Sequence, residues 1–527
     1  MIAFEMLERS PIFNAVENFV VAKVPTSHVE IVNLFLNYRV PGVGAIDFSF
    51  FENDFEFSDK EFLVDKAVIT ENFKHIKGNN RKYFEGVIRS GMGLPKRDTL
   101  RCNLITFENR NFVADRGCDT SSSPFIAQEL VEDVINMAFD CSKLYSCMDD
   151  KIGQNKVKLS EWVDKRNPMG WKGLLKGLGD FFYDRANMVK YRLMVKADCK
   201  PKLDDTPLSS YVTGQNIVYH DRKITAMFSH VFGQVVDRIK YCLSTKFLVY
   251  HGYDCDTFAS EVYDRLGDIS AYHTYELDIS KYDKSQGALM KDIERVVLLQ
   301  LGVCGDIVDS FFCGEYDSIV TTAQNELMLT VDAQRRSGGA NTWLGNTVVL
   351  MMLLTVLLRD KDFDLVLLSG DDSLIFCREE ISLDAMPLSQ QYGFDVKMFD
   401  QCTPYFCSKY FVQTPDRLFF VPDPFKLLVK FGARRAEDVD LLHEVFMSFV
   451  DLTKPFADEN VVQELVRLDE RRYGYNPHSY AAFCVIHVVR ANFSQFQRCF
   501  SRSEPLRRGK KKAVEEETVF NSRKEYG

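Results

Sequence analysis

The chain has 527 residues, of which 46% are hydrophobic and 27% charged, a composition that predicts a globular protein of several subdomains and excludes a largely disordered one. Its formal net charge of −10 argues against a protein that coats nucleic acid with its whole surface, but not against a basic channel inside an acidic shell. The 14 cysteines lack the paired spacing of a zinc site or a disulfide framework, which favours reduced thiols in a cytosolic protein.

The first 85 or so residues alternate phenylalanine-rich and acidic segments and show no catalytic pattern, so we expect an N-terminal extension of unknown role over 1–85. A turn at 121–124 precedes a helical pattern from Phe125 to Phe139.

Lysines and arginines interleaved with aromatic residues are concentrated between Lys190 and Lys240. For most of them an ordinary solvated face is the simpler interpretation. Two compact clusters, at 195–202 and 219–223, lie instead in apolar, strand-like segments. Because Arg and Lys neutralise the charge that builds during phosphoryl transfer, the two clusters together predict a clamp for a polyphosphate.

The segment 275–286 carries two spaced aspartates. Asp278 ends a predicted strand, and Asp283 follows shortly before a helix that is expected to start near Ser285 and run to Leu301. A hairpin is predicted over 318–331, and beyond it the chain reads Ser337-Gly338-Gly339 before a long apolar helix. This order favours a nucleic-acid-contacting turn on a rigid support, with an ordinary glycine-rich helix start as the alternative.

The segment 365–376 consists of two apolar runs, each as long as a buried strand, joined by Gly370-Asp371-Asp372. Adjacent carboxylates between buried strands repel each other and lose hydration unless a cation is present, and a divalent metal is the usual solution. If the two predicted strands are neighbours in one sheet, Asp278 and Asp371 lie side by side and can serve two magnesium ions.

The rest of the chain alternates further elements. The longest apolar run, 348–358, is shorter than the about 20 residues that cross a bilayer, so we expect a buried helix and no transmembrane segment. We predict a helix at 383–392, a strand at 394–399, a hairpin at 405–412 and helices from about 437 to 501. The last residues form opposed charge blocks with almost no apolar content and predict a disordered tail over 501–527.

The motifs as a set resemble a known family. Asp278-x4-Asp283, Ser337-Gly338-x3-Thr342-x3-Asn346 and Gly370-Asp371-Asp372 resemble motifs A, B and C of the RNA-dependent RNA polymerases of positive-strand RNA viruses. Segments 394–397 and 405–410 resemble motifs D and E of the alphavirus-like supergroup, and the basic segments around Lys200 and Arg222 resemble motif F. The resemblance covers about residues 95–446, and within the group the run 336–346 is most similar to plant-virus, closterovirus-like enzymes.

The resemblance implies an α+β fold shaped like a right hand. Its palm would be an antiparallel sheet backed by helices over 271–415, carrying motifs A to E. The fingers would come from 86–270 with a hairpin insertion at 303–336, and a helical thumb would follow over 416–500.

The resemblance also implies the roles of site residues. Asp278 and Asp371 would be the main metal ligands, with Asp372 less essential, and the cofactor would be Mg²⁺, with Mn²⁺ as a substitute. Asp283 would read the ribose hydroxyls with Thr342 or Asn346. The template loop would be Ser337, Gly338 and Gly339, the general acid Lys397, and the nucleotide-channel residues Lys200, Lys202, Arg222 and Lys223. For Lys202, Lys223 and Lys397, an ordinary surface lysine is the alternative.

The implied function is RNA-directed RNA synthesis that replicates and transcribes a positive-strand viral genome by two-metal nucleotidyl transfer. The partners would be template and nascent RNA, ribonucleoside triphosphates and viral methyltransferase/helicase replication proteins, which would recruit the chain to membrane-associated complexes in the host cytoplasm. Two alternatives stay open: a reverse transcriptase or DNA polymerase with the same metal chemistry, and an inactive polymerase-like scaffold that binds RNA.

Overall fold

The structure is a computed structural model. It describes residues 27–40, 67–69, 84–89, 99–110, 121, 123–166, 184–196, 214–323, 325–400 and 403–502. Most of the expected N-terminal extension and nearly all of the charged tail lie outside these residues, as do Lys200 and Lys202.

The helices, in chain order, have the following bounds. They are α2 (His28–Arg39), α3 (Leu100–Arg110), α4 (Pro124–Ala138), α5 (Cys141–Ser146), α6 (Lys156–Asp164), α8 (Arg185–Met188), α10 (Arg222–Cys242), α11 (Cys255–Leu266), α12 (Tyr282–Ser285), α13 (Ala288–Gln300), α14 (Gly305–Tyr316), α15 (Thr342–Leu357), α16 (Met386–Tyr392), α17 (Pro424–Gly432), α18 (Val439–Leu452), α19 (Glu459–Tyr473), α20 (Ser479–Ala491) and α21 (Phe493–Gln497), with 3₁₀ turns η4 (Ile269–Ala271) and η5 (Lys454–Ala457).

One five-stranded sheet carries the aspartate motifs. Its strand order is β11 (Val396–Asp400), β6 (His273–Ile279), β10 (Asp372–Cys377), β9 (Leu365–Ser369) and β5 (Phe247–Val249). All neighbours are antiparallel except β5 and β9, which are parallel. The expected antiparallel palm sheet is therefore mixed, and it includes a strand that precedes the expected boundary at residue 271.

The central strands β9 and β10 of this sheet are buried on both faces, which explains why β9 is a continuous apolar run. Alternate residues of β9 and β10 enter different cores: Val366 and Ile375 pack with α4, α10, α13 and α15, whereas Leu367 and Phe376 pack with α11 and a three-stranded sheet. That small sheet has the order β12 (Tyr405–Phe406), β13 (Lys409–Gln413) and β14 (Leu418–Pro422). Helix α15 is apolar all round and almost entirely buried, as predicted for the run 348–358.

A second five-stranded sheet precedes α15 in the chain. Its order is β1 (Ala67–Ile69), β8 (Leu327–Asp332), β7 (Asp317–Thr322), β3 (Lys190–Val195) and β4 (Asn216–Tyr219). The predicted hairpin over 318–331 is confirmed as β7 and β8. The insertion expected at 303–336 is more than a hairpin, because its first part forms α14. The helix expected from Ser285 is interrupted: α12 ends there and α13 begins at Ala288.

The C-terminal helices form a separate hydrophobic core with α2. Phe35 of α2 contacts Phe425 and Phe483 edge-to-face, so an N-terminal segment packs against a helix more than 400 residues later. A small sheet of β15 (Arg435–Ala436), β2 (Phe84–Gly86) and β16 (Phe500–Arg502) closes this region. The predicted helices after residue 437 are confirmed.

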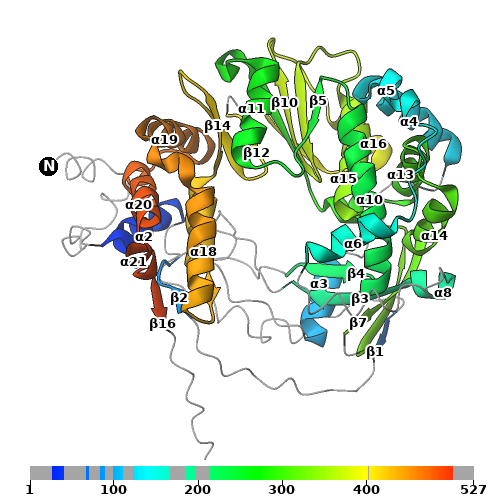
Figure 1. The fold of residues 1–527 in the computed structure, drawn as a ribbon, viewed down its shortest axis with the longest axis horizontal. Coiled ribbons are helices and arrows are strands. Elements are labelled where there is room, and N and C mark those ends of the chain that lie inside the picture. The colour runs from blue at the N-terminus through cyan, green and yellow to red at the C-terminus, as the bar shows by residue number, and fades with distance from the viewer. Residues whose placement is uncertain are drawn as a thin grey trace, which may run out of the picture.

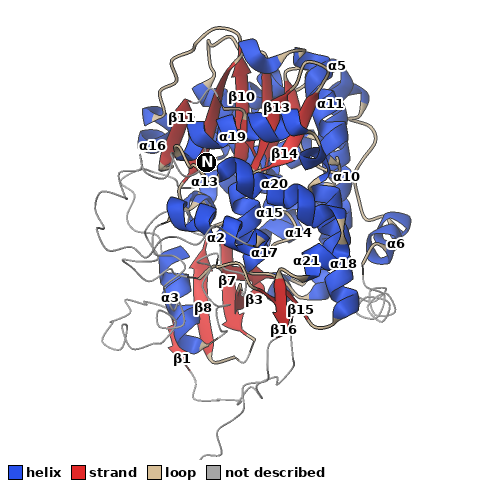
Figure 2. Cartoon of the chain, turned by 90° about the vertical axis from the view of Figure 1, so that its left-hand side faces the viewer, coloured by secondary structure: helices blue, strands red, loops and turns tan. Residues whose placement is uncertain are grey.

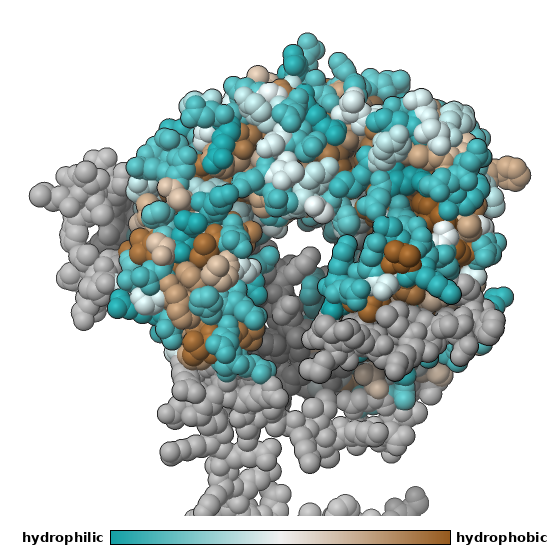
Figure 3. All heavy atoms as spheres, in the orientation of Figure 1, coloured by the Kyte–Doolittle hydropathy of each residue, from teal (hydrophilic) through white to brown (hydrophobic). Residues whose placement is uncertain are grey.

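These parts form an arch. In Figure 1 the C-terminal helices stand on the left, the aspartate-bearing sheet lies across the top, and α10, α14 and the second sheet stand on the right. Figure 2 shows the two five-stranded sheets at opposite ends of the molecule, and Figure 3 shows the surface hollowed between the two arms. Among the described helices, none has the length and apolar character to cross a bilayer.

Candidate active site

The Gly-Asp-Asp segment is a tight hairpin turn held by α15. Gly370 occupies the first central position with φ of +65°, a conformation that glycine adopts without steric cost. The Gly370 N–H donates to Thr347 Oγ1 at 3.0 Å, and Trp343 Nε1 donates to Ser369 Oγ at 3.2 Å. A buried helix therefore fixes the turn on which Asp371 and Asp372 stand.

The three predicted metal ligands lie on neighbouring strand ends. β6 and β10 pair with Leu277 opposite Ser373, so the next position of each strand brings Asp278 beside Asp372. Asp278, Asp371 and Asp372 are all exposed residues. Asp372 is exposed as a whole residue, but its carboxyl group is desolvated. This desolvation, followed by the charge of Asp371, raises the pKa of Asp372 to about 6. The three aspartates concentrate negative charge that a bound cation would neutralise.

Lys397 lies across the strand pair from this cluster. The register of β11 on β6 places it directly opposite Asp278, where side chains of paired residues share a face. It is exposed. The ammonium can therefore approach a carboxylate of the candidate metal site.

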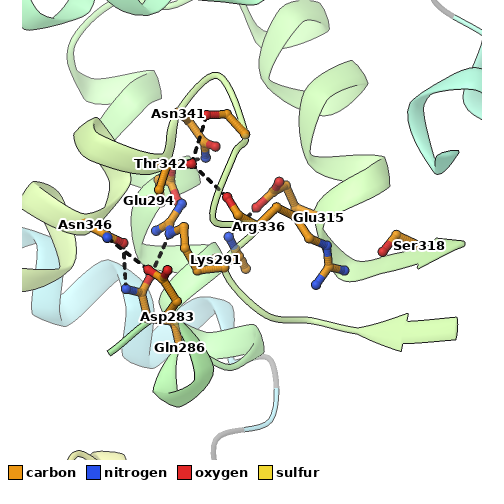
Figure 4. A network of polar contacts seen from close by, with 12 residues as sticks. Asp283, Gln286, Lys291, Glu294, Glu315, Ser318, Arg336, Asn341, Thr342 and Asn346 are labelled. Carbon is orange, nitrogen blue, oxygen red and sulfur yellow. Dashed lines mark hydrogen bonds and ion pairs between the residues drawn. The ribbon is translucent and has the colours of Figure 1, made fainter. Parts of the chain in front are cut away.

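Asp283 and Asn346 come together from α12 and α15. Asn346 Nδ2 donates to Asp283 Oδ1 at 3.1 Å (Figure 4). The Tyr282 hydroxyl donates to the Asn346 carbonyl at 2.9 Å. Asp283 and Asn346, both predicted to face the ribose, are therefore hydrogen-bond partners in the fold. The Thr342 hydroxyl, the other predicted helper, donates instead to the carbonyls of Arg336 and Gly339 at 2.7 and 2.9 Å, closing the loop before α15.

The Ser337-Gly338 loop is tied to the second sheet. Ser337 Oγ donates to the Asn216 carbonyl at 3.0 Å and accepts from the Val218 N–H at 3.1 Å. The Gly338 N–H donates to the Val218 carbonyl at 2.8 Å, and a Cβ at Gly338 would come within 2.6 Å of Ile217 Cγ2. Glycine is therefore required at this close approach, and the loop bridges β4 and α15.

The basic residues of the predicted clamp are only partly placed. Arg222 and Lys223 are exposed and begin α10 with Asp221 as the N-cap, so they are not in a strand-like segment as expected. This follows from the Asp221 carboxylate accepting the Lys223 N–H at 2.9 Å, a bond that starts a helix. Lys200 and Lys202 lie outside the described residues.

A buried charge cluster behind the loop was not predicted. Lys291 and Glu294 of α13 and Glu315 of α14 meet Arg335 and Arg336, and all five are fully buried. Arg335 Nη1 lies 2.7 Å from Glu294 Oε2, Lys291 forms an ion pair with Glu315, and Arg336 Nη2 donates to the carbonyls of Val331 and Asp332 at 3.1 Å each. A sequence signal did exist, because Lys291 and Glu294 are flanked by apolar residues on the core-facing side of an amphipathic helix.

Glu315 is the anionic centre of this cluster. Desolvation opposes its charge, but Lys291, Arg336 and Arg335 outweigh that effect and lower the pKa of Glu315 to about 2. The Tyr191 hydroxyl donates to Glu315 Oε1 at 3.0 Å, and the Tyr191 ring stacks on His220. The two residues before Ser337 are thus anchored through charge, Arg335 to Glu294 of α13 and Arg336 to Glu315 of α14 and Tyr191 of β3.

Across the described ranges, no three His, Cys, Asp or Glu side chains converge as a self-sufficient metal site. Asp278, Asp371 and Asp372, all within those ranges, are therefore not brought together as a three-carboxylate metal site in this structure.

Comparison with known proteins agrees with this geometry. A family model described as RNA dependent RNA polymerase matches residues 57–499. The chain is 52% identical over 500 residues to replicase polyprotein 1ab of Grapevine leafroll-associated virus 3 (isolate United States/NY1), which covers 95% of this chain and 18% of that protein. It is 34% identical over 484 residues to replicase polyprotein 1ab of Beet yellows virus (isolate Ukraine), covering 91% and 16%.

A third relative carries further activities in its name. The methyltransferase/helicase/RNA-directed RNA polymerase of Raspberry bushy dwarf virus (isolate Malling Jewel raspberry/R15) is 32% identical over 333 residues, covering 61% of this chain and 19% of that protein. The chain thus spans less than a fifth of the length of these three relatives. The match over most of the chain, together with the two replicases that align along nearly all of it, shows that the chain belongs to the viral RNA-dependent RNA polymerases of the alphavirus-like supergroup.

Proposed function

We propose that the chain replicates and transcribes a positive-strand viral RNA genome by template-directed addition of ribonucleotides to a 3′-hydroxyl. The observation that carries this proposal is the pairing of β6 with β10, which brings Asp278 beside the Asp371-Asp372 turn. Carboxylates at adjoining strand ends suit a nucleotidyl transfer assisted by two metal ions.

The arch has the features of a right hand. In this proposal the aspartate-bearing sheet is the palm, and the second sheet with α14 belongs to the fingers. The helices from α17 onward form the thumb, and the hollow of Figure 3 takes the template and nascent strand. The proposed boundaries are 86–270 together with 303–336 for the fingers, 271–415 with the β5 strand added for the palm, and 416–500 for the thumb.

Asp278 and Asp371 are the residues proposed to hold magnesium, with Asp372 in support and Mn²⁺ as a substitute. When bound, the ions would activate the attacking hydroxyl and neutralise phosphate charge. Oxygen donors at exposed strand ends fit such an ion, and the pKa of Asp372 is raised first by desolvation and then by the charge of Asp371, which a cation would offset.

The chain's own groups would bind and orient the nucleotide. The Asp283 carboxylate would accept a hydrogen bond from a ribose hydroxyl. Asn346 would hold that carboxylate in place through the 3.1 Å hydrogen bond from its Nδ2 to Asp283 Oδ1. Lys397 would supply the proton that the departing pyrophosphate takes up. Arg222 and Lys223 would attract the triphosphate.

The names of the relatives suggest the setting. One relative carries methyltransferase and helicase functions in its name, and two are replicase polyproteins. We propose that such replication proteins accompany this chain and recruit it to membrane-associated complexes in the host cytoplasm.

Asp371→Ala tests the proposed function. We expect RNA extension with magnesium to fall by at least about a hundredfold, because a catalytic metal contributes several kcal/mol to transition-state stabilisation. Asp416→Ala is the matched control, since Asp416 is an exposed turn aspartate between β13 and β14. The measurement is primer extension with ribonucleotides and, separately, with deoxynucleotides, alongside circular dichroism for folding.

Three results would contradict the proposal. Full extension activity in a folded Asp371→Ala variant would contradict the assignment of Asp371 as a metal ligand. A preference for deoxynucleotides indicates the reverse-transcriptase alternative, and wild-type protein that binds RNA but never extends it indicates the scaffold.

A further inference from the structure

A chain of three hydrogen bonds joins a buried arginine to Asp283. Arg335 Nε donates to Gln286 Oε1 at 2.8 Å, Gln286 Nε2 donates to Asn346 Oδ1 at 2.8 Å, and Asn346 Nδ2 donates to Asp283 Oδ1 at 3.1 Å. Figure 4 shows Gln286 beside Asn346 and Asp283. Arg335 and Gln286 are 1% and 0% exposed, so solvent does not compete for the first two bonds, whereas the third is partly buried.

The two ends of this chain have opposite hydrogen-bonding character. A guanidinium only donates, and an ionised carboxylate only accepts. Each amide between them has one accepting and one donating side, so the oxygen of Gln286 must face Arg335 and its nitrogen must face Asn346. The same constraint then turns the nitrogen of Asn346 toward Asp283.

The Arg335 guanidinium, at one end of this hydrogen-bond chain, is held in its orientation by an ion pair. Arg335 Nη1 lies 2.7 Å from Glu294 Oε2, and Glu294 Oε1 also accepts from Asn341 Nδ2 at 2.5 Å. Desolvation disfavours the Arg335 charge, but Glu294 and Glu315 outweigh it and raise the pKa of Arg335. The donor-only end therefore stays charged and fixed.

We propose that Gln286 is a positioning residue for ribose selection, which relays the donor-only character of Arg335 to Asn346 and so to Asp283. The inference rests on the proposed function, in which Asp283 reads the ribose. With one carboxylate oxygen held by Asn346, the remaining accepting positions of Asp283 are presented to a ribose hydroxyl in one orientation.

Gln286→Glu reverses the relay with almost no change of shape. A carboxylate at 286 accepts from Arg335 and turns its second oxygen toward Asn346. Asn346 must then donate to residue 286, which places its own oxygen against the carboxylate of Asp283. We expect the preference for a ribonucleotide over the matching deoxynucleotide to fall by at least about tenfold, because the partly buried contact between Asn346 and Asp283 becomes repulsive.

The experiment compares kcat/KM for one ribonucleotide and its deoxynucleotide on the same primed template. The ratio of the two values is independent of the fraction of active enzyme, so a purely structural defect leaves it unchanged. Gln234→Glu is the matched control: this half-buried glutamine donates to the His230 carbonyl at 3.2 Å within α10, outside the site. Asp283→Ala is measured in parallel.

The outcomes separate the relay from the proposed function. Loss of discrimination in Gln286→Glu and Asp283→Ala, with the Gln234→Glu ratio unchanged, supports the relay. Loss in Asp283→Ala alone overturns the relay and leaves the proposed function intact. An unchanged ratio in Asp283→Ala overturns both the ribose assignment and the relay, and a wild type without extension overturns the proposed function.

A second variant covers a failure of Gln286→Glu to fold. Gln286→Leu keeps the side-chain bulk but removes both relay bonds, so the Asn346 amide is free to turn. We expect a smaller decrease in the same ratio, of about threefold to tenfold. An unchanged ratio in folded Gln286→Leu overturns the relay.

Discussion

Behind the Ser337 loop, more positively charged than negatively charged side chains are buried. Lys291, Arg335 and Arg336 face Glu294 and Glu315, all without solvent contact. Burying charges costs several kcal/mol per ion unless each is paired, so this cluster contributes geometric definition more than stability. Arg336 illustrates the cost: within the described structure its Nε and Nη1 groups have no hydrogen-bond acceptor, and the guanidinium lies 5.5 Å from the Tyr191 ring.

Gly345 is the residue that lets this cluster approach α15. A Cβ there would collide with the Arg335 guanidinium and the Glu294 carboxylate. We expect Gly345→Ala to lower the free energy of unfolding by about 2 kcal/mol, because overpacking must displace a buried ion pair. Urea denaturation measures this change.

Gly233→Ala is the control for that substitution. Gly233 lies within α10 and is exposed, and a Cβ added there would meet no neighbouring side chain or segment within 4 Å. Alanine there should raise the free energy of unfolding by up to about 1 kcal/mol through helix propensity. Equal effects of the two substitutions would remove the packing explanation for Gly345.

At the scale of elements, the end of α19 docks on the strand that carries Asp278. Arg472 donates to both carboxylate oxygens of Glu276, at 2.8 and 3.2 Å, and its guanidinium stacks 3.5 Å from the Tyr405 ring. The two side chains are only 14% and 19% exposed. Because Glu276 is two residues before Asp278 on β6, this contact ties the C-terminal helices to the candidate metal site.

Arg472→Ala should lower the free energy of unfolding by about 2 kcal/mol, since it leaves Glu276 partly buried without its bidentate partner. A double-mutant cycle with Glu276→Ala isolates the pair. Arg467→Ala is the control, because the Arg467–Glu464 pair lies on the surface of the same helix, with 68% exposure at the arginine, and should change stability by less than about 0.5 kcal/mol. A coupling energy near zero for Arg472 and Glu276 would contradict the docking role.

Element prediction from sequence succeeded where periodicity is local. The strands around Gly370, the hairpin β7–β8 and the buried helix α15 are all present close to their expected positions. It did not anticipate that β5 joins the same sheet, because a three-residue strand has no period of its own. Nor did it anticipate that Cys407, in the β12–β13 turn, meets Asp372, a contact between distant segments.

At the scale of the molecule, the buried charges give stability a defined pH dependence. His220 is stacked on Tyr191 and bonded to the Met188 carbonyl at 2.8 Å; Glu315, Arg336 and Asp221 are the charged groups around it. Desolvation lowers the pKa of His220 to about 4. The unfolded chain therefore binds a proton at higher pH than the folded chain does, and acidification favours unfolding.

The free energy of unfolding should consequently fall by about 3 kcal/mol between pH 6.5 and pH 4 on account of His220. Glu315 acts in a lower window: its depressed pKa contributes stability that is present above about pH 4.5 and lost as the pH falls toward 2. Denaturation of His220→Gln from about pH 7.5 to 4.5 checks the first window. A slope equal to that of the wild type would contradict this assignment.

The sequence alone determined the family resemblance, the main elements and the carboxylates of the candidate site, because spacing and periodicity along the chain record those features directly. Only the tertiary structure decided the burial of Arg335 and Arg336 and the pairing of Arg472 with Glu276. It also decided the direction of the relay from Arg335 through Gln286 to Asn346, whose bonds join residues 49 and 60 positions apart. The physical reason is that desolvation and hydrogen-bond partnership depend on which distant segments pack together, and no local pattern carries that information.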